Sequence, residues 1–453
     1  MAPGSRGLYF FRDGIHNLPV GAGFPASGTT SHDNETSSMR ISLIDLISAL
    51  SGALDLVSPA VVGHHRRVAA IATALGRRLN LPPADITDLR LAALLHDVGA
   101  FSLKSRLDAL VFDTNDLDHA ETGWRLLRAL PRLERPARLV RWHHTRFDDF
   151  GDILDDPRTL LLGNLLNLAD RVDVSLRRDR DLDTEARATI RRIGMLRGRT
   201  FDPETLRALD DTIAGNDLDP EFWHGAVRDA RCTADCLELS LEDGEIPVFS
   251  RAFSQVIDFR SRFTATHSRG VAAVAHALAG LEGLPGDIRA RVLLAGDLHD
   301  LGKLAVPTEI LEKPGPLDPR EAEIMRRHAE IGERVLSQVP GLEDVAEFGC
   351  RHHERPNGRG YPRGLAGDRL KQPSLLVAAA DVFTAVLEDR PYRPGMTLDR
   401  ARSLLRTLAD DGDLDTRAVD LLLTHTTQVD EARRQAQDEA RLQFTTFAPG
   451  FAA

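Results

Sequence analysis

The feature that most constrains the fold of this chain is an ordered set of histidine and aspartate residues that occurs twice. Three members of the set recur 203 residues later, three recur 209 residues later and one recurs 211 residues later. In matching order the two sets are His64, His96, Asp97, His119, His143, His144 and Asp170, and His267, His299, Asp300, His328, His352, His353 and Asp381. The flanking words agree as well, as in H-A-E-T-G against H-A-E-I-G. This duplication predicts two homologous domains that differ by small insertions.

The residues between these positions favour helices. Leu- and Ala-rich stretches from Ile41 onward have apolar residues three and four apart, and aromatic residues make up only 5% of the chain. The segment from Asp318 to Glu321, D-P-R-E, combines an N-cap, a proline at the first helical position and a glutamate at the third. We therefore predict an all-α fold, a tandem duplication of a helical bundle with a metal site in each bundle core.

The chain is long enough, at 453 residues, for two or three domains. Residues 1–40 are rich in Gly, Ser, Thr, Asn and Asp without apolar periodicity, which predicts a flexible N-terminal tail. We place a first domain at 41–230, a second domain at 245–440 and a C-terminal tail at 441–453. The stretch L-E-D-G-E-I-P around residue 243 marks the expected boundary between the two domains.

Charge and composition exclude several classes of protein. The formal net charge of −11 argues against a large nucleic-acid surface but permits a small anionic ligand held by local basic residues. No segment approaches the roughly 18 apolar residues of a membrane span, and the first residues lack the layout of a secretory signal. Three cysteines without a C-x-x-C pair predict neither a disulfide framework nor a thiolate zinc site. We expect a cytoplasmic protein that acts without a membrane.

Each repeated set offers five imidazoles and two carboxylates, and these donors are typical of a hydrolytic metal centre. Seven ligands suit two ions about 3.5–4 Å apart, with the Asp of the His-Asp pair bridging them and a shared water lowered in pKa. We favour two Fe or Mn ions per active domain, with Zn, Co, Ni or Mg left open. Isolated histidines such as His65 are expected to be ordinary surface or core residues.

The second domain resembles the HD-GYP family, the HD-superfamily phosphohydrolases that linearise cyclic di-GMP. The resemblance rests on the words L-H-D-L-G-K, H-A-E-I-G, H-H-E-R-P-N-G-R-G-Y-P, A-A-A-D-V-F and D-R-P-Y-R. It implies an HD-type helical bundle that hydrolyses the 3′–5′ phosphodiester of cyclic di-GMP to linear pGpG or GMP. The implied metal ligands are the seven members of the second set, of which Asp300 is also catalytic.

The resemblance further implies how the substrate is bound. Lys303 would act in catalysis by neutralising the scissile phosphate, and Tyr361 would stack on the ligand or hydrogen-bond to it. The complete implied set of substrate-binding residues is Lys303, Gly358, Gly360, Tyr361, Arg390 and Arg393.

Three positions of the second domain depart from the family pattern. Asn357 stands where the family usually has Asp, and Thr384 stands where a second Asp follows A-D-V-F, although the first repeat keeps Asp173 there. Phe263 replaces the Glu with which some members bind a third metal, as Ala60 does in the first repeat. The sequence therefore favours a two-metal centre over a three-metal one.

The first domain resembles the same superfamily, but its GYP signature is missing. Ala100 replaces Lys303, and H-H-T-R-F-D-D-F-G-D replaces the whole H-H-E-R-P-N-G-R-G-Y-P element. Asp148, Asp149 and Asp152 are expected where a ligand anion would approach, and they would repel it. We therefore predict a degenerate, regulatory or structural domain that binds metal but does not hydrolyse cyclic di-GMP.

Two alternatives to a cyclic di-GMP phosphodiesterase stay open. One is a nucleotide-binding signalling scaffold with little turnover, which Asn357 and Thr384 favour. The other is an HD phosphohydrolase that acts on another cyclic dinucleotide, such as cyclic GMP–AMP, or on a nucleoside phosphate. The complete ligand set and Lys303 favour an enzyme. The sequence leaves open whether a homodimer or a signalling protein partner forms.

Overall fold

The computed structural model describes residues 39–56, 62–100, 118–176, 188–189, 192–193, 199–215, 237–258, 266–389 and 394–447. Helices dominate this part of the chain, and its sheet is a single antiparallel pair of two-residue strands, β1 (Ile41–Ser42) and β2 (Ser240–Leu241). The all-α prediction is confirmed. Within the described ranges, each helix is too short or too polar to cross a bilayer.

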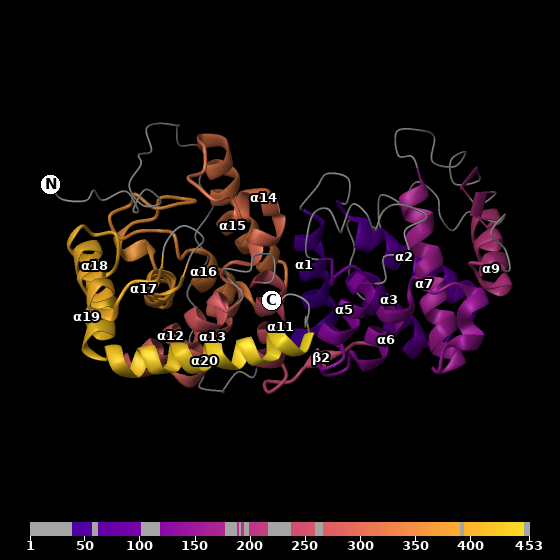
Figure 1. Cartoon of the computed structure of the whole chain (residues 1–453), viewed down its shortest axis with the longest axis horizontal. Coiled ribbons are helices and arrows are strands. Elements are labelled where there is room, and N and C mark those ends of the chain that lie inside the picture. The colour runs from indigo at the N-terminus through magenta and orange to yellow at the C-terminus, as the bar shows by residue number, and fades with distance from the viewer. Residues whose placement is uncertain are drawn as a thin grey trace, which may run out of the picture.

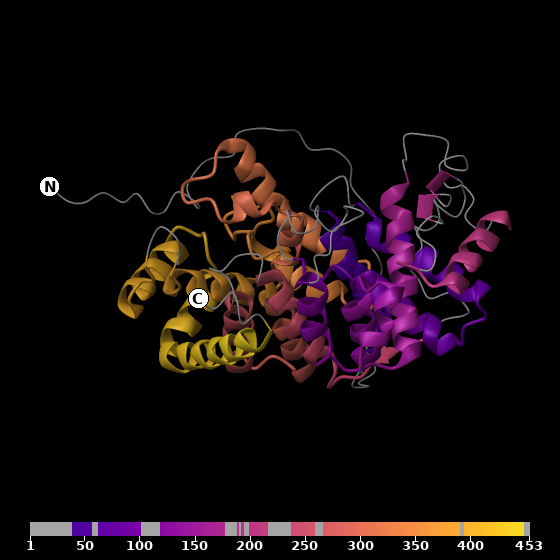
Figure 2. The same cartoon turned by 45° about the vertical axis from the view of Figure 1, so that its right-hand side comes forward.

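The chain forms two groups of helices that lie side by side (Figure 1). They also occupy opposite ends of the molecule in the view turned by 45° (Figure 2). The first group contains α1 (Leu43–Asp55), α2 (His64–Arg78), α3 (Pro83–Leu95), α5 (Asp118–Leu127), α6 (Glu134–Trp142), η1 (Phe147–Asp152), α7 (Pro157–Ser175) and α9 (Pro203–Ala214). The second begins with α11 (Ile246–Asp258), α12 (His267–Leu281), α13 (Gly286–Leu298), η2 (Leu301–Ala305), α14 (Thr308–Leu311) and α15 (Pro319–Leu336). It continues with α16 (Glu343–Cys350), η3 (Gly367–Arg369), α17 (Gln372–Leu387), α18 (Leu398–Asp410), α19 (Thr416–Thr424) and α20 (Thr426–Phe447).

Local signals in the sequence explain where several of these helices begin. α15 starts at the predicted capping box, in which the Asp318 side chain accepts from the Glu321 amide and the Glu321 side chain accepts from the Asp318 amide. Asp156 and Asp202 cap α7 and α9 through their side chains alone, which accept from backbone amides of the first turn, and each is followed by a proline at the first helical position. These caps fix the start of α7 and α15, both of which carry residues of the repeated sets.

Helix α1 lies between the two groups (Figure 1). It packs on α2 and α3 of the first group and also on η2 and α15 of the second. Leu43, Ile47 and Leu54 of α1 are almost fully buried, and they belong to one apolar cluster that runs through both groups. The two groups therefore share a core at α1.

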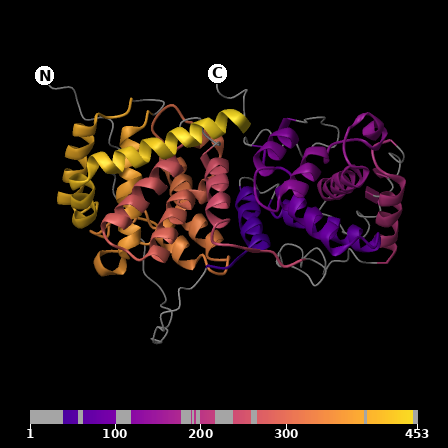
Figure 3. The same cartoon turned by 90° about the horizontal axis from the view of Figure 1, so that it is seen from below.

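Helix α20 crosses the second group on the side seen in Figure 3. It packs mainly on α12, and it also contacts α5 of the first group. It runs on to Phe447, past the predicted start of the C-terminal tail at residue 441, because R-L-Q-F-T-T-F contains no helix breaker before Pro449. Residues 448–453, like 1–38 of the predicted N-terminal tail, lie outside the described residues.

Two glycines at equivalent positions bring the backbone of each His-Asp turn against a neighbouring helix. A Cβ added to Gly302 would lie 1.9 Å from the carbonyl oxygen of His328, and a Cβ on Gly99 would lie 2.2 Å from that of His119. Only glycine permits this approach, which holds the His-Asp turn against the helix that carries another histidine of the set.

We expect Gly302→Ala to destabilise the protein by about 1–3 kcal/mol or more, because the added methyl group must push two backbones apart. Chemical unfolding of the full chain measures the loss. Gly286→Ala is the matched control, since a Cβ there meets nothing within 4 Å. Equal stability of the two variants would contradict the prediction.

Candidate metal centres

The seven predicted ligands of the second set lie together in the core of the second group. They come from the start of α12, the turn after α13, α15, the turn after α16, and α17. Their donor atoms lie within 4.8 Å of one another in three overlapping groups: His267, His299 and Asp381; His328, His352 and His353; and His299, Asp300 and His352. Asp300 lies between the first two groups, with Oδ2 3.2 Å from His299 Nε2 and Oδ1 3.4 Å from His328 Nε2.

Several imidazoles are oriented by the backbone of their own helix. The Nδ1 atom of each lies within hydrogen-bonding distance of the carbonyl oxygen three residues earlier. The pairs are His96 with Ala93 (2.8 Å), His143 with Val140 (2.6 Å), His299 with Gly296 (2.7 Å), His328 with Met325 (2.5 Å) and His352 with Gly349 (2.7 Å). Because Nδ1–H donates to the carbonyl, the lone pair is left on Nε2, which faces the centre of each set.

These residues fit a metal centre on the chemistry of their donor atoms. Nε2 of His299, Nε2 of His328 and Oδ1 of Asp300 are buried and have no hydrogen-bond partner. Buried polar atoms are normally satisfied, so three such atoms with lone pairs but no hydrogen-bond partner fit the binding of a cation. The candidate groups among the described residues consist of imidazoles and carboxylates, a donor set that several divalent ions accept.

Burial sets the protonation of some of the histidine ligands. It lowers the pKa of His328 to about 4 and that of His352 to about 3, so both imidazoles are neutral and able to bind metal near pH 7. Burial alone would raise the pKa of Asp300, but His299 and Lys303 outweigh it and hold the pKa well below its usual range. Neutral imidazoles of His328 and His352 thus lie beside an ionised carboxylate.

Two of the ligating histidines are exceptions. Burial alone would lower the pKa of His299, but the carboxylate of Asp300 outweighs burial and raises it. The second exception is His267. Burial alone would lower its pKa, but the carboxylates of Glu388 and Asp381 outweigh burial and raise it to about 10. His267 Nδ1 lies 2.9 Å from Glu388 Oε2, and Nε2 lies 3.1 Å from Asp381 Oδ1. Without metal, the imidazole is therefore an imidazolium held between two carboxylates.

We expect metal binding to this centre to release about one proton, because His267 must lose its Nε2 proton before it can act as a ligand. The raised pKa also predicts that apparent metal affinity increases with pH up to about 10. Titration calorimetry of the full chain with Mn²⁺ in two buffers of different ionisation enthalpy measures the released protons. The control is Glu388→Gln, which should release fewer. Heats that do not depend on the buffer would show that His267 is already neutral.

Glu388 is a residue of the centre that sequence reasoning missed. In the first set, Asp173 of α7 lies 2.8 Å from His64 Nδ1. The equivalent position in α17 is Thr384, and Glu388 supplies the carboxylate one helical turn later. The departure at Thr384 therefore leaves His267 with a carboxylate partner. A Glu four residues after Thr384, directly after the last residue of α17, was the available signal.

The residues that donate hydrogen bonds to the carboxylate partner of the first histidine differ between the two sets. Arg67 Nε donates to Asp173 Oδ1 at 2.6 Å in the first set. In the second set Gly270 replaces Arg67, and Gln437 of α20 donates to Glu388 Oε1 at 2.6 Å. A Cβ on Gly270 would lie 2.9 Å from Gln437 Nε2 and from Thr384 Cγ2, so a larger residue there would require these side chains to shift.

Lys303 is placed at the solvent side of the second set. Its Nζ lies 2.5 Å from Asp300 Oδ2, and its side chain is 24% exposed whereas that of Asp300 is 3% exposed. The contact with Asp300 was not expected from the sequence. Contact of Lys303 with the substrate stays a prediction.

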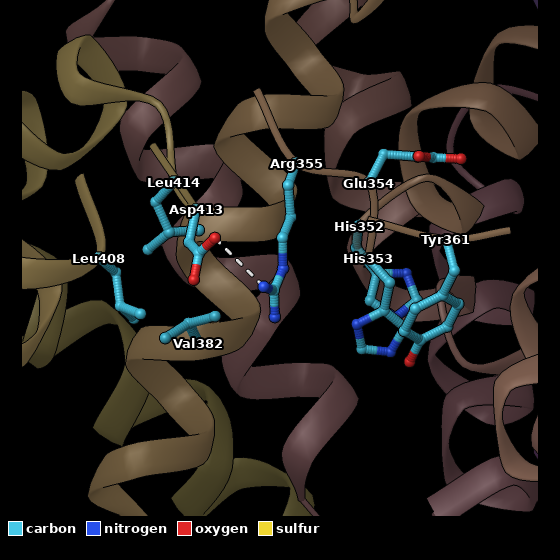
Figure 4. A pocket seen from close by; sticks show the side chains of 9 residues that line it. All are labelled: His352, His353, Glu354, Arg355, Tyr361, Val382, Leu408, Asp413 and Leu414. Atoms are coloured by element: carbon cyan, nitrogen blue, oxygen red, sulfur yellow. Dashed lines mark ion pairs between the residues drawn. The ribbon is translucent and has the colours of Figure 1, made fainter. Parts of the chain in front are cut away.

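The G-Y-P loop forms one wall of a cleft beside the second set (Figure 4). The Tyr361 ring stacks on His353 with centroids 4.6 Å apart. Gly358 has a φ of +77°, and a Cβ on Gly360 would lie 2.5 Å from the Arg355 amide nitrogen. Both glycines are therefore required by the loop itself. Their predicted contacts with substrate stay predictions, as does that of Tyr361.

Asn357 departs from the Asp of the family pattern, and its side chain forms hydrogen bonds with the residues around it. Its side-chain amide donates to Asp413 Oδ1 at 2.8 Å and to the Asp411 carbonyl at 3.2 Å, and its side-chain oxygen accepts from the Arg359 amide. An Asp at this position would face the carboxylate of Asp413. The predicted ligand-binding residues Arg390 and Arg393 lie outside the described residues, as do Phe263 and Ala60.

The first set is also brought together. Its donor atoms form two groups, His64, His96 and Asp97, and His119, His143 and His144. Asp170 completes the first group, with Oδ1 3.4 Å from His64 Nε2. His65, expected to be an ordinary residue, is buried with its ring 5.0 Å from that of His96 and its Nδ1 bonded to Asp55.

The charges around the first set differ from those around the second. Arg171 is buried, and its Nε donates to Asp170 Oδ2 at 3.0 Å. The equivalent residue of the second set is Val382, which lines the cleft. The first centre thus lacks the lysine of η2 and gains a buried guanidinium from α7, which the sequence analysis missed. Asp148, Asp149 and Asp152 form part of η1 and are exposed.

Comparison with known proteins gives a consistent result. Family models described as HD domain match residues 61–175 and 251–417. The chain is 30% identical over 400 residues to the 3′3′-cGAMP-specific phosphodiesterase 1 of Vibrio cholerae, an alignment that covers 86% of this chain and 93% of the relative. It is 37% identical over 194 residues to the cyclic di-GMP phosphodiesterase response regulator RpfG of Xanthomonas campestris, covering 42% of this chain and 50% of that protein.

A solved structure has the same fold. The crystal structure of a cyclic GMP-AMP specific phosphodiesterase of V. cholerae superimposes with a TM-score of 0.60 at 22% sequence identity. The superposition covers 86% of this chain and 98% of the other. It therefore includes both groups of helices.

Proposed function

We propose that the second metal centre hydrolyses a phosphodiester bond of a cyclic dinucleotide. The proposal starts from the fact that this chain belongs to the HD family and carries two HD domains. The observation that carries the proposal is a complete ligand set with Lys303 on its Asp300, beside a cleft that His352, His353 and Tyr361 of the G-Y-P loop line. The relatives act on 3′3′-cGAMP or on cyclic di-GMP by their names. We propose a guanine-containing cyclic dinucleotide as the substrate, with cyclic di-GMP giving linear pGpG or GMP.

The residues of the centre prepare it for hydrolysis. When bound, two metal ions would supply a hydroxide near neutral pH and offset the negative charge of the phosphate. Asp300 lies between the two histidine groups, and its carboxylate would help to hold the metal. Lys303 adds a positive charge on the open side of Asp300, where an anionic phosphodiester would approach.

The test is turnover by the full chain after loading with Fe²⁺ or Mn²⁺ and measurement of the bound metal. Cyclic di-GMP, 3′3′-cGAMP and cyclic di-AMP are incubated separately, and the products are separated by chromatography. We expect linear dinucleotide or mononucleotide from the guanine-containing substrates. Tight binding of cyclic di-GMP without any product at full metal loading would favour the signalling scaffold instead.

A further inference from the structure

The cleft beside the second centre contains a carboxylate that the proposed hydrolysis does not use. The cleft is lined by His352, His353, Glu354, Arg355, Tyr361, Val382, Leu408, Asp413 and Leu414. One end is therefore formed by metal ligands, and the other end carries the carboxylate of Asp413.

The side chains of the cleft are divided by chemistry (Figure 4). The rings of His352, His353 and Tyr361 lie on one side of Arg355. Asp413 lies on the other side, among three aliphatic residues, Val382, Leu408 and Leu414. This arrangement suits a ligand with its phosphate at the imidazoles and a flat, partly apolar ring with polar edges at the aliphatic end.

One oxygen of Asp413 is firmly held. Oδ1 accepts from Asn357 Nδ2 at 2.8 Å and lies 3.1 Å from an Arg355 guanidinium nitrogen and 3.7 Å from one of Arg359. The side chain of Asp413 is 14% exposed and lines the cleft. Asp413 therefore presents a preorganised acceptor to the cleft, with the Arg355 guanidinium beside it as a donor.

We infer that Asp413 and Arg355 recognise the Watson–Crick edge of a guanine base in this cleft, an inference that rests on the proposed function. Guanine carries an acceptor, O6, next to two donors, N1–H and the 2-amino group. Arg355 can donate to O6 while Asp413 accepts from the two donors. Adenine in the same pose would set its 6-amino group against the guanidinium and its N1 lone pair against the carboxylate, so both contacts would become repulsive.

This assignment also gives Asn357 a role. Its amide helps to fix Asp413, whereas an Asp at that position would repel it. Asn357, which departs from the family's D-G-x-G-Y-P word, and Asp413, the acceptor in the cleft, are therefore coupled through this hydrogen bond. Discrimination by hydrogen bonds is strong because the wrong base leaves polar groups of the cleft unpaired.

The test uses the metal-loaded full chain and the variant Asp413→Asn, which keeps the shape of the side chain but replaces an acceptor with a donor. We expect kcat/KM for cyclic di-GMP to fall about 10- to 100-fold, the effect of losing charged hydrogen bonds, while kcat/KM for cyclic di-AMP is unchanged or increased. Bound metal should be unchanged. Asp411→Asn is the matched control, because Asp411 is exposed and contacts Asn357 through its backbone carbonyl.

Binding of GMP and AMP to the same variants by calorimetry separates this inference from the proposed function. Preference for GMP that is lost in Asp413→Asn supports the inference, even if the chain hydrolyses none of the three cyclic dinucleotides. Two results would overturn the inference: an equal loss of kcat/KM for all three cyclic dinucleotides in Asp413→Asn, or a ratio of GMP to AMP affinity that this variant leaves unchanged. In either case, turnover of cyclic dinucleotides by the unchanged chain would still uphold the proposed function.

Discussion

Replacing His299 and Asp300 with alanine in the full chain is expected to abolish hydrolysis of cyclic dinucleotides, by about three orders of magnitude or more. Asp300 is the residue placed between the two histidine groups of the second centre, so its loss removes a ligand from both groups at once. Turnover of cyclic di-GMP and 3′3′-cGAMP, together with bound metal per chain, measures the effect.

The control for this prediction is the equivalent pair in the first centre, His96→Ala with Asp97→Ala. We expect this variant to keep most of the activity, because the first centre has Ala100 in place of Lys303 and lacks the G-Y-P loop. Both variants should lose metal from the centre that is changed. Activity that survives the change at His299 and Asp300 but not the change at His96 and Asp97 would assign the reaction to the first domain.

Glu388→Ala should lower the affinity of the second centre for metal about 10- to 100-fold, the usual effect of removing the carboxylate partner of a ligating imidazole. His267 loses the hydrogen bond to its Nδ1, and Gln437 Nε2 loses the carboxylate to which it donates. Competition for Mn²⁺ with a fluorescent chelator measures the affinity, and turnover should fall in parallel.

A rescue variant tests the reason for this effect. Thr384→Asp added to Glu388→Ala restores the carboxylate at the position that Asp173 occupies in the first domain, where it serves His64. We expect recovery of metal affinity in this double variant. Glu431→Ala, an exposed glutamate of α20, is the control for charge alone. Failure of the double variant to recover would mean that the two helix positions are not equivalent, and wild-type affinity in Glu388→Ala alone would refute the role of Glu388.

The repeated set was predictable because its members keep their spacing in two copies of one fold. The start of α15 was predictable for a local reason, since Asp318 and Glu321 satisfy each other within four residues. Glu388 and Arg171 were not predicted from the sequence, although each contacts a predicted metal ligand, His267 and Asp170 respectively. Their roles depend on which way a helix face points in three dimensions, and a pattern of spacing in one sequence does not contain that information.

Asp413 illustrates a second limit of the sequence. The residues that hold it, Asn357 and Arg355, are more than fifty positions away, and they meet it only because the G-Y-P loop packs against the turn between α18 and α19. The sequence showed that Asn357 departs from the family pattern, but not that a second residue compensates for it. Such pairs become visible only when both partners are placed in space.

The position of α1 has a consequence for how a gene of this kind can change. Because α1 covers η2 and α15 as well as α2 and α3, a shortened gene without the first domain would leave apolar surface of the second domain exposed to solvent. Loss of the first domain is therefore expected to destabilise its neighbour, whatever chemistry the first metal centre performs. Sharing of one helix thus gives the first domain a structural part in the fold of the second.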